Sequence, residues 1–227
     1  MAAAEDKIKG RVNTIVHPEQ VNQSNIFSTK TQLILASASP RRRKLLSTLG
    51  LTFTVQVADI EEQPLAHETP QEFVLRAATE KTQTVSQHHP HAWVLGADTV
   101  VVLDNRILGK PVDAADAKRL LALLSGRWHE VLTGFCLSRK DLSHLTSQTV
   151  ATSVKFVDFD KTVAAAYVQT GEPLDKAGAY GIQGKGGFLV ERINGSYSNV
   201  VGLPLTEVVG KLLQLEIIIP APEQDRN

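Results

Sequence analysis

The chain has 227 residues, enough to bury a complete hydrophobic core as one large domain or two close lobes. Its 24 basic and 24 acidic residues balance, so no overall field favours nucleic acid or a membrane surface as a partner. The single cysteine, Cys136, excludes an internal disulfide and any metal site built from several cysteines. Because no apolar stretch approaches the roughly 20 residues that span a bilayer, and the N-terminus lacks the apolar core of a secretion signal, we expect a cytoplasmic protein.

The chain divides into three parts by composition. Residues 1–30 are polar with weak periodicity, and we expect them to form an extension outside the core. Residues 31–218 carry the strand and helix patterns and are predicted to form the core domain. Residues 219–227 are predicted to be a polar tail.

The strongest local pattern is the stretch of residues 33–49. An apolar run over residues 33–35 suits a buried strand, and small residues follow. Ser39 before Pro40 is typical of a helix start, so a helix is predicted from Pro40 to about Leu49. The basic residues 41–43 crowd the positive end of this helix, an arrangement that a bound anion would compensate. A solvated basic first turn is the alternative, but the preceding small residues favour a phosphate cradle.

The rest of the chain alternates strand and helix patterns. Strands are predicted at residues 53–58, 93–103, 107–108, 128–137, 145–157, 188–193 and 197–201. Helices are predicted at residues 70–87, 113–124, 160–168 and 204–215. Thr69 and Glu72 form a capping box at the start of the first of these helices. Interleaved strands and helices with hairpins predict an α/β fold, with a mixed twisted sheet and flanking helices rather than a purely parallel sheet.

Asp98 interrupts the most apolar strand pattern, residues 93–103. A carboxylate buried there is costly unless a cation or hydrogen-bond donors compensate it. We interpret it as a general base that takes a proton from water or as a metal ligand, the alternative being a structural aspartate. With Glu61 and Glu62 it could hold a hard divalent ion through oxygen ligands, although these two glutamates suit a solvated acidic loop equally well. His129 has no histidine or cysteine at metal-ligand spacing, so zinc is not expected.

Two lysines and a glycine-rich segment complete the candidates. Lys81, late in the helix at residues 70–87, and Lys110, just after the predicted hairpin, are either ligand-binding or surface lysines. Residues 178–187 contain five glycines but neither the P-loop nor the dinucleotide-binding spacing. Such bare backbone suits the close approach of a flat or charged ligand. Within it, the amide of Gln183 is able to read the edge of a pyrimidine.

These motifs together carry a family resemblance. LILASASPRRRKLL, the acidic IEE, the Glu80-Lys81 pair, GADTVV, GKP, LSGRWHEVLTG, DKAGAYGIQG and NGSYSNVVGLP resemble, in this order, the Maf family of nucleotide pyrophosphatases over about residues 32–215. The resemblance implies two lobes around a central cleft and a homodimer. It also implies Mg²⁺- or Mn²⁺-dependent cleavage of nucleoside triphosphates between the α- and β-phosphates, which releases a monophosphate and pyrophosphate.

The same resemblance assigns roles to individual residues. The general base falls on Asp98, and the positions that set base choice fall on Arg42, Thr99 and Gln183. The phosphate- and metal-handling positions fall on Ser37, Arg41, Glu62, Lys81 and Lys110. From the residues themselves, we also expect Ser39 to lie in the turn that holds the triphosphate and Asp98 to be a further metal ligand. The YGIQG form resembles the branch that acts on dTTP and UTP rather than on 7-methyl-GTP. The alternatives are a nucleotide-binding regulator of cell division without turnover and a pyrophosphatase for the purine nucleotides ITP and XTP.

Overall fold

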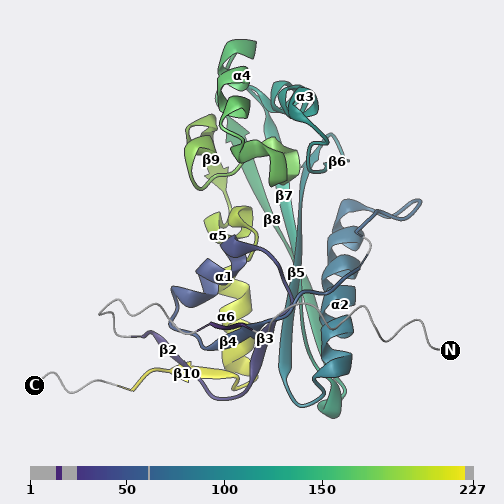
Figure 1. Ribbon diagram of the computed structural model, residues 1–227, viewed down its shortest axis with the longest axis vertical. Coiled ribbons are helices and arrows are strands. Elements are labelled where there is room, and N and C mark those ends of the chain that lie inside the picture. The colour runs from purple at the N-terminus through teal and green to yellow at the C-terminus, as the bar shows by residue number, and fades with distance from the viewer. Residues whose placement is uncertain (1–13, 17–24, 61, 223–227) are drawn as a thin grey trace, which may run out of the picture.

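One long mixed sheet runs through the molecule, and the helices pack on its faces (Figure 1). The computed structural model describes residues 14–16, 25–60 and 62–222. The strands of the sheet are β1 (Thr14–Val16), β3 (Leu33–Leu35), β4 (Phe53–Val55), β5 (Trp93–Leu103), β6 (Arg106–Leu108), β7 (Trp128–Arg139), β8 (His144–Phe156) and β9 (Val190–Asn194). Their order is β1-β4-β3-β5-β7-β8-β9, with β6 also paired to β5.

The pairing confirms the predicted mixed sheet. Strand β3 runs parallel to both β4 and β5. The remaining strand pairs of this sheet are antiparallel. The two longest of them are β5 with β7 and β7 with β8. A separate antiparallel pair is formed by β2 (Phe27–Thr29) and β10 (Ile218–Pro220).

Most of the described helices begin directly after a capping side chain. They are α1 (Pro40–Ser47), α2 (Pro70–His88), α3 (Ala114–Leu124), α4 (Lys161–Gln169), α5 (Tyr197–Val201) and α6 (Leu205–Gln214). Short 3₁₀ turns are η1 (Lys140–Leu142), η2 (Glu172–Asp175), η3 (Ala177–Ala179) and η4 (Lys185–Leu189). Ser39, Thr69, Asp113 and Asp160 each accept a backbone N–H at the start of α1, α2, α3 and α4. None of the described helices has the length and apolar character that a membrane-spanning segment needs.

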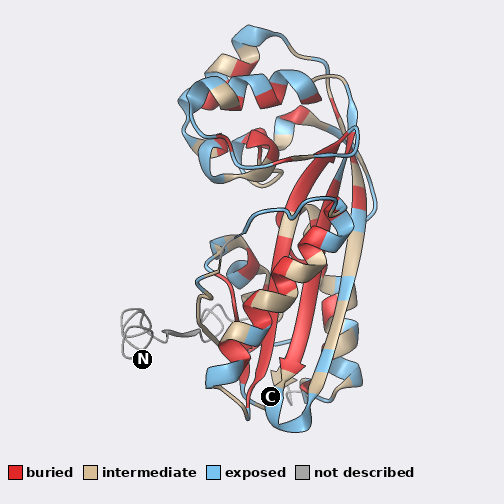
Figure 2. Cartoon of the chain, turned by 90° about the vertical axis from the view of Figure 1, so that its right-hand side faces the viewer, coloured by how far each residue is buried: buried red, intermediate tan, exposed pale blue. Residues whose placement is uncertain are grey.

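The lower lobe in Figure 1 is built on both faces of the sheet. Leu33 and Leu35 share one face with buried residues of α1 and α6, while Ile34 packs with Val85 of α2 on the other. This alternation follows from the period of two along a strand. Figure 2 shows the buried residues following the strands and the inner side of α2.

The upper lobe has a core of its own around the other ends of β5, β7 and β8. Leucines of α3, including Leu120, Leu121 and Leu124, pack with Phe156 of β8 and with Tyr167 of α4. Asp104 and Asn105, with φ of 49° and 61°, make the predicted two-residue turn between β5 and β6. The molecule therefore has the two lobes that the sequence resemblance implies, joined by long strands (Figure 1).

One element was predicted wrongly, because residues 197–201 form helix α5 and not a strand. Tyrosine and the two valines favour a strand by propensity. The side chain of Ser196 instead accepts the N–H of Asn199 at 3.3 Å and caps a helical turn. The amide Nδ2 of the buried Asn199 then donates to the Val131 carbonyl at 3.1 Å, which fixes the turn against β7. Local capping and one buried amide outweigh strand propensity here.

The structure adds two short strands within residues 1–30. Strand β1 pairs with β4 in the main sheet, and β2 pairs with β10 near the other end of the chain. Phe27 of β2 also packs against the core that contains α6. Residues 1–13, 17–24 and 223–227 lie outside the described residues, so the predicted domain boundaries at residues 31 and 218 stay predictions.

Candidate active site

A cavity of about 330 Å³ lies where one edge of β5 is left open between two partner strands. Strand β3 pairs with the start of β5, at residues 93–95, and β6 pairs with its end, at residues 101–103. The intervening stretch of this edge carries Asp98 and Thr99, both of which line the cavity. Because successive residues point to opposite faces of a sheet, the gap gives access to side chains from both faces at once.

The cavity brings together every site residue predicted from the sequence whose side chain the structure describes. The residues Ser37, Ser39, Arg41, Arg42, Glu62, Lys81, Asp98, Thr99, Lys110 and Gln183 all line it. Of the remaining candidates, Glu61 lies outside the described residues, and Arg43 is exposed and does not line the cavity. The placement establishes proximity, whereas the role of each residue stays a prediction.

Asp98 and Glu62 converge on a single lysine. Lys81 Nζ lies 2.7 Å from Asp98 Oδ1 and 2.9 Å from Glu62 Oε1. The Lys81 and Asp98 side chains are buried, whereas that of Glu62 is half exposed. The ammonium supplies the compensation that a buried carboxylate in the apolar strand β5 requires.

Close packing of α2 on the sheet makes this contact possible. A Cβ atom at Gly96 of β5 would lie 2.8 Å from the Ala78 carbonyl oxygen of α2. Gly134 of β7 is paired with Asp98 in the sheet, and a Cβ atom at Gly134 would lie even closer to the Val74 carbonyl oxygen of α2. Both glycines let the helix approach the strands, and that approach places Lys81 over Asp98.

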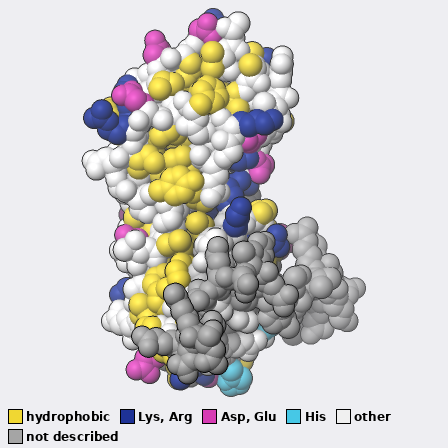
Figure 3. All heavy atoms as spheres, turned by 90° about the vertical axis from the view of Figure 1, so that its left-hand side faces the viewer, with side chains coloured by type: hydrophobic (Ala, Val, Ile, Leu, Met, Phe, Trp, Pro, Cys, Tyr) yellow, Lys and Arg dark blue, Asp and Glu magenta, His cyan; other side chains and the backbone are white. Residues whose placement is uncertain are grey.

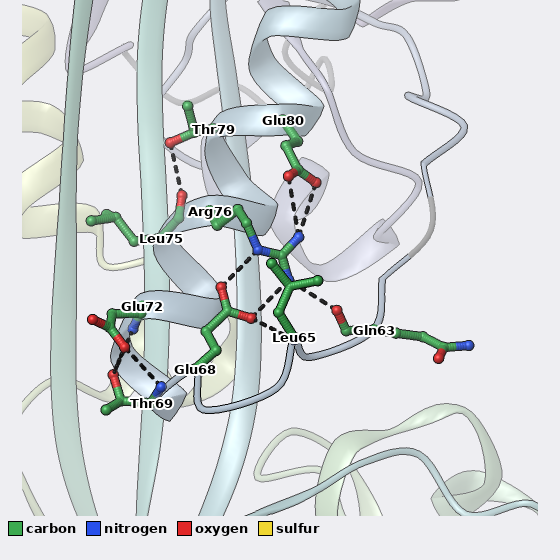
Figure 4. A network of polar contacts seen from close by, with 9 residues as sticks. All are labelled: Gln63, Leu65, Glu68, Thr69, Glu72, Leu75, Arg76, Thr79 and Glu80. Atoms are coloured by element: carbon green, nitrogen blue, oxygen red, sulfur yellow. Dashed lines mark hydrogen bonds and ion pairs between the residues drawn. The ribbon is translucent and has the colours of Figure 1, made fainter.

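An ionic network holds the segment that carries Glu62 against α2 (Figure 4). The guanidinium of Arg76 donates to Glu68 at 2.7 Å and to Glu80 at 3.1 Å. It also donates to the main-chain carbonyl of Gln63 at 2.9 Å, one residue after Glu62. The contact fixes the backbone beside Glu62 and so helps to hold its carboxylate near Lys81.

Arg42 is buried beneath the cavity and fixes its floor. Its Nε donates to the Gly202 carbonyl at 2.7 Å, Nη1 donates to the Ala97 carbonyl at 2.9 Å, and Nη2 donates to Thr99 Oγ1 at 2.9 Å. Nη1 also donates to Ser37 Oγ at 3.2 Å. Burial lowers the pKa of the Arg42 guanidinium, although the nearby carboxylates oppose this effect. A guanidinium has five N–H donors, so little of its capacity remains for a ligand.

The turn of small residues at the start of α1 forms the adjoining wall. Ser37 Oγ accepts the Ser39 N–H at 3.2 Å, and Ser39 Oγ accepts the Arg42 N–H at 3.4 Å. Arg41, at the N-terminus of α1, reaches across to Asp175 of the upper lobe, with Nη1 3.7 Å from Oδ2. This exposed pair connects the two sides of the cavity and contributes little stability.

The upper lobe supplies Lys110 and Gln183 to the cavity, together with three residues that sequence reasoning did not single out. These are Asp175, Lys176 and Tyr180. All three lie within the DKAGAYGIQG block quoted for the family resemblance, so that block was the available signal. Figure 3 shows basic side chains gathered at the waist between the two lobes, beside acidic ones.

His129 contacts Tyr180 on the side away from the cavity. Its Nε2 lies 2.9 Å from Tyr180 Oη, and its ring packs edge-on against both Tyr180 and Phe156. Burial lowers the pKa of His129 to about 4, so its imidazole is neutral at neutral pH. Burial also raises the pKa of Tyr180, which keeps its hydroxyl protonated as a donor to the imidazole. His129 therefore packs in the core behind the cavity wall and supports Tyr180.

The two carboxylates on Lys81 also fit a hard divalent cation. Oxygen donors suit Mg²⁺ and Mn²⁺, and neither ion needs an all-protein site because phosphate oxygens and water complete the coordination. Within the described part of the chain, no group of three or more histidine, cysteine, aspartate or glutamate side chains forms a metal site. Glu62 and Asp98 thus offer two oxygen-donor side chains at one side of the cavity.

Comparison with known proteins agrees with the sequence motifs. The family model described as Maf-like protein matches residues 32–215. A protein named dTTP/UTP pyrophosphatase from Desulfotalea psychrophila is 52% identical over 193 residues, covering 85% of this chain and 99% of the relative. A relative of the same name from Myxococcus xanthus is 51% identical, covering 84% of this chain and 96% of its own. A third, from Geobacter sulfurreducens, is 47% identical over 82% of this chain and 97% of its own.

Proposed function

The chain belongs to the Maf-like protein family, and from this premise we propose that it hydrolyses dTTP and UTP to the nucleoside monophosphate and pyrophosphate. Relatives that carry the name dTTP/UTP pyrophosphatase match it over nearly their whole length. The observation that carries the proposal is one cavity lined by a buried carboxylate, Asp98, several cationic side chains and the amide of Gln183.

The cationic side chains of the cavity bind the triphosphate. Arg41 lies at the N-terminus of α1, where the helix dipole adds to its positive charge. Lys110 and Lys176 face it from the upper lobe, so anionic oxygens between the lobes meet positive charge on both sides. On binding, the triphosphate takes the place of Asp175 as the partner of Arg41.

Asp98 acts as the general base. Its carboxylate is buried at the cavity edge and held at 2.7 Å by Lys81, which fixes its orientation. From there it orients a water molecule and accepts the proton as the water attacks phosphorus. Lys81 balances the negative charge of the site and holds the Asp98 carboxylate in place. Direct attack by water is favoured because no histidine that could activate a nucleophile is among the described residues that line the cavity.

Glu62 and Asp98 are the residues that would hold a divalent cation. Such a cation, Mg²⁺ or Mn²⁺, neutralises phosphate charge when it is bound. The same two carboxylates bind the Lys81 ammonium, at 2.7 Å for Asp98 and 2.9 Å for Glu62. The chain itself contributes hard oxygen donors, and the Glu62 carboxylate is about half exposed and so open to the cavity.

Gln183 reads the base. Its amide pairs with both a carbonyl oxygen and a ring N–H, a pattern that uracil and thymine share and cytosine lacks. Thr99 and Arg42 form the floor of the pocket, with Thr99 held by the Arg42 guanidinium and by Thr133 at 3.0 Å. We therefore expect Arg42 to act mainly by fixing Thr99 and Gly202, and only secondarily by donating to the base.

We further propose that the protein is a homodimer, as the family resemblance implies, and that it acts in the cytoplasm. Neither nucleic acid nor a membrane is an expected partner. Light scattering of the purified protein would measure a mass of twice the chain. A monomer at micromolar concentration would remove this part and leave the proposed reaction unaffected.

A panel of triphosphates tests the proposed function. We expect dTTP and UTP to be the best substrates with Mg²⁺, and CTP, ATP, GTP and ITP to have kcat/KM at least about tenfold lower. Gln183→Ala should reduce this preference more than it slows pyrophosphate release from UTP, because the amide contacts the base and not the phosphates. Equal kcat/KM for UTP and CTP would contradict the assignment of Gln183, and a best activity on ITP would contradict the proposed preference for pyrimidine nucleotides.

A further inference from the structure

The loop that carries Gln183 is held by a carboxylate and a phenol outside the cavity. The loop comprises residues 181–187, and Gln183 lies near its middle. Neither Glu172 of η2 nor Tyr167 of α4 lines the cavity. We infer that Glu172 and Tyr167 are positioning residues for base selection, which set the place of Gln183 through the backbone of this loop. The inference rests on the proposed function.

Backbone N–H groups on both sides of Gln183 donate hydrogen bonds to the side chains of Tyr167 and Glu172. The Gly181 N–H donates to Tyr167 Oη at 3.2 Å, on the N-terminal side. On the C-terminal side, the Lys185 N–H donates to Glu172 Oε2 at 3.0 Å and the Gly186 N–H donates to Oε1 at 2.9 Å. The loop is thus fixed at both ends by side chains that do not belong to it.

The two anchors are joined to each other and to the core. Tyr167 Oη donates to Glu172 Oε1 at 2.9 Å, so one short bridge connects the two ends of the loop. Tyr167 is only 3% exposed and packs in the upper-lobe core, which makes it a rigid support. Lys176 Nζ donates to the main-chain carbonyl of Glu172 at 2.5 Å and holds the turn η2 from the cavity side.

The charge state of both anchors favours these contacts. Burial raises the pKa of Glu172, but the N–H groups of Lys185 and Gly186 and the Tyr167 hydroxyl more than offset it, so the pKa lies below its ordinary value. Burial raises the pKa of Tyr167, which keeps its hydroxyl protonated. An ionised acceptor with three donors is the stronger kind of hydrogen-bonded anchor.

The loop also packs closely on itself and on Glu172. A Cβ atom at Gly186 would lie 2.6 Å from the Gly181 carbonyl oxygen, so the two ends of the loop are in close contact. Gly184, with φ of 87°, lies against the Glu172 carboxylate, where an added Cβ would be 2.9 Å from Oε2. The geometry of the loop is therefore set by Glu172, and a displaced Gln183 amide would lose its alignment with the base edge.

A loss of either anchor should alter base selection without removing a group that contacts substrate. We expect Glu172→Ala to lower the ratio of kcat/KM for UTP over CTP about fivefold or more, mainly by raising KM for UTP. Glu172→Gln keeps one acceptor oxygen but replaces the other with an NH₂ group, which cannot accept a backbone N–H. Its UTP-to-CTP ratio of kcat/KM should therefore lie between those of wild type and Glu172→Ala. Tyr167→Phe keeps the ring in the core and should lower the ratio as well. Glu191→Gln, an exposed glutamate on β9, is the matched control and should keep the wild-type ratio.

A double-mutant cycle separates positioning from a general loss of stability. In a Gln183→Ala background, Glu172→Ala should leave the UTP-to-CTP ratio unchanged, because the group that it positions is already absent. An undiminished effect there, or a wild-type ratio in both Glu172→Ala and Tyr167→Phe, overturns the inference. Where Glu172→Ala does not fold, Tyr167→Phe carries the same cycle. A wild-type protein that hydrolyses no triphosphate refutes the proposed function itself, whereas a selective wild type with unaltered variants refutes the inference alone.

Discussion

The buried imidazole of His129 makes stability depend on pH in a way that can be measured. Its side chain is 3% exposed, and burial lowers its pKa from 6.5 to about 4 in the folded protein. The unfolded chain therefore binds a proton near pH 6.5, while the folded protein resists protonation until about pH 4. The folded state loses stability as the pH falls through this window, and above about pH 7 the imidazole is neutral in both states.

The size of the effect follows from the two pKa values. Each pH unit between them corresponds to about 1.4 kcal/mol, so the whole window is worth about 3 kcal/mol, of which about 2 kcal/mol is lost between pH 7 and pH 5. Exposed acidic residues such as Asp141, whose pKa is lowered to about 2 by Arg139 and His91, add to the loss in acid. Because they are the same in wild type and variant, a comparison between the two cancels their contribution.

Urea unfolding at about pH 7 and about pH 5 is the assay. We expect His129→Gln, whose amide replaces Nε2 as the acceptor for Tyr180, to lose about 2 kcal/mol less than wild type between these pH values. His67→Asn is the control, since His67 is exposed and asparagine tolerates its φ of 67°. Equal losses in wild type and His129→Gln would refute the reasoning, because they would show that this imidazole is not held neutral by burial.

Three further predictions concern the cavity and the N-terminus. Asp98→Asn should keep the fold but lower kcat by about 10²-fold or more, which is the usual loss for a general base. The exposed control Asp59→Asn should keep wild-type turnover, and near-normal turnover in Asp98→Asn would remove Asp98 from the mechanism. Excess EDTA should abolish turnover and added Mg²⁺ or Mn²⁺ should restore it, since Glu62 and Asp98 offer hard oxygen donors; full activity in EDTA would disprove the metal requirement. Removing residues 1–24 takes away β1 but no residue that lines the cavity, so kcat/KM for UTP should stay within about twofold of wild type. A truncated protein that is folded but inactive would show that this segment completes the site.

Much of the fold could be predicted because its elements carry local signals. Ser39 before Pro40 and the Thr69–Glu72 pair mark helix starts that the structure confirms. The segment 197–201 could not be predicted this way, because its helix depends on a contact with β7 that only the folded chain provides. The apolar strand at residues 93–103 likewise continues through Gly96 and Asp98, since Lys81 neutralises the carboxylate that seemed to interrupt it.

The candidate site was predictable as a set of residues but not as an arrangement. The sequence indicates Asp98, Lys81 and Glu62 individually, yet their meeting on one ammonium depends on the close approach of α2 to β5. Similarly, Gln183 stands out as an amide in a glycine-rich loop, while its anchors lie in other elements. A residue such as Glu172, which acts through backbone N–H groups, leaves no recognisable pattern in a single sequence.

The central claim is that water cleaves a pyrimidine triphosphate between the α- and β-phosphates in this cavity. Phosphorus NMR of UTP incubated with the wild-type protein and Mg²⁺ tests it most directly, because it identifies every phosphorus-containing product at once. We predict equal amounts of UMP and pyrophosphate, and about a hundredth of these amounts or less with Asp98→Asn over the same time. The release of UDP and inorganic phosphate, or UTP that binds and stays intact, would contradict the account.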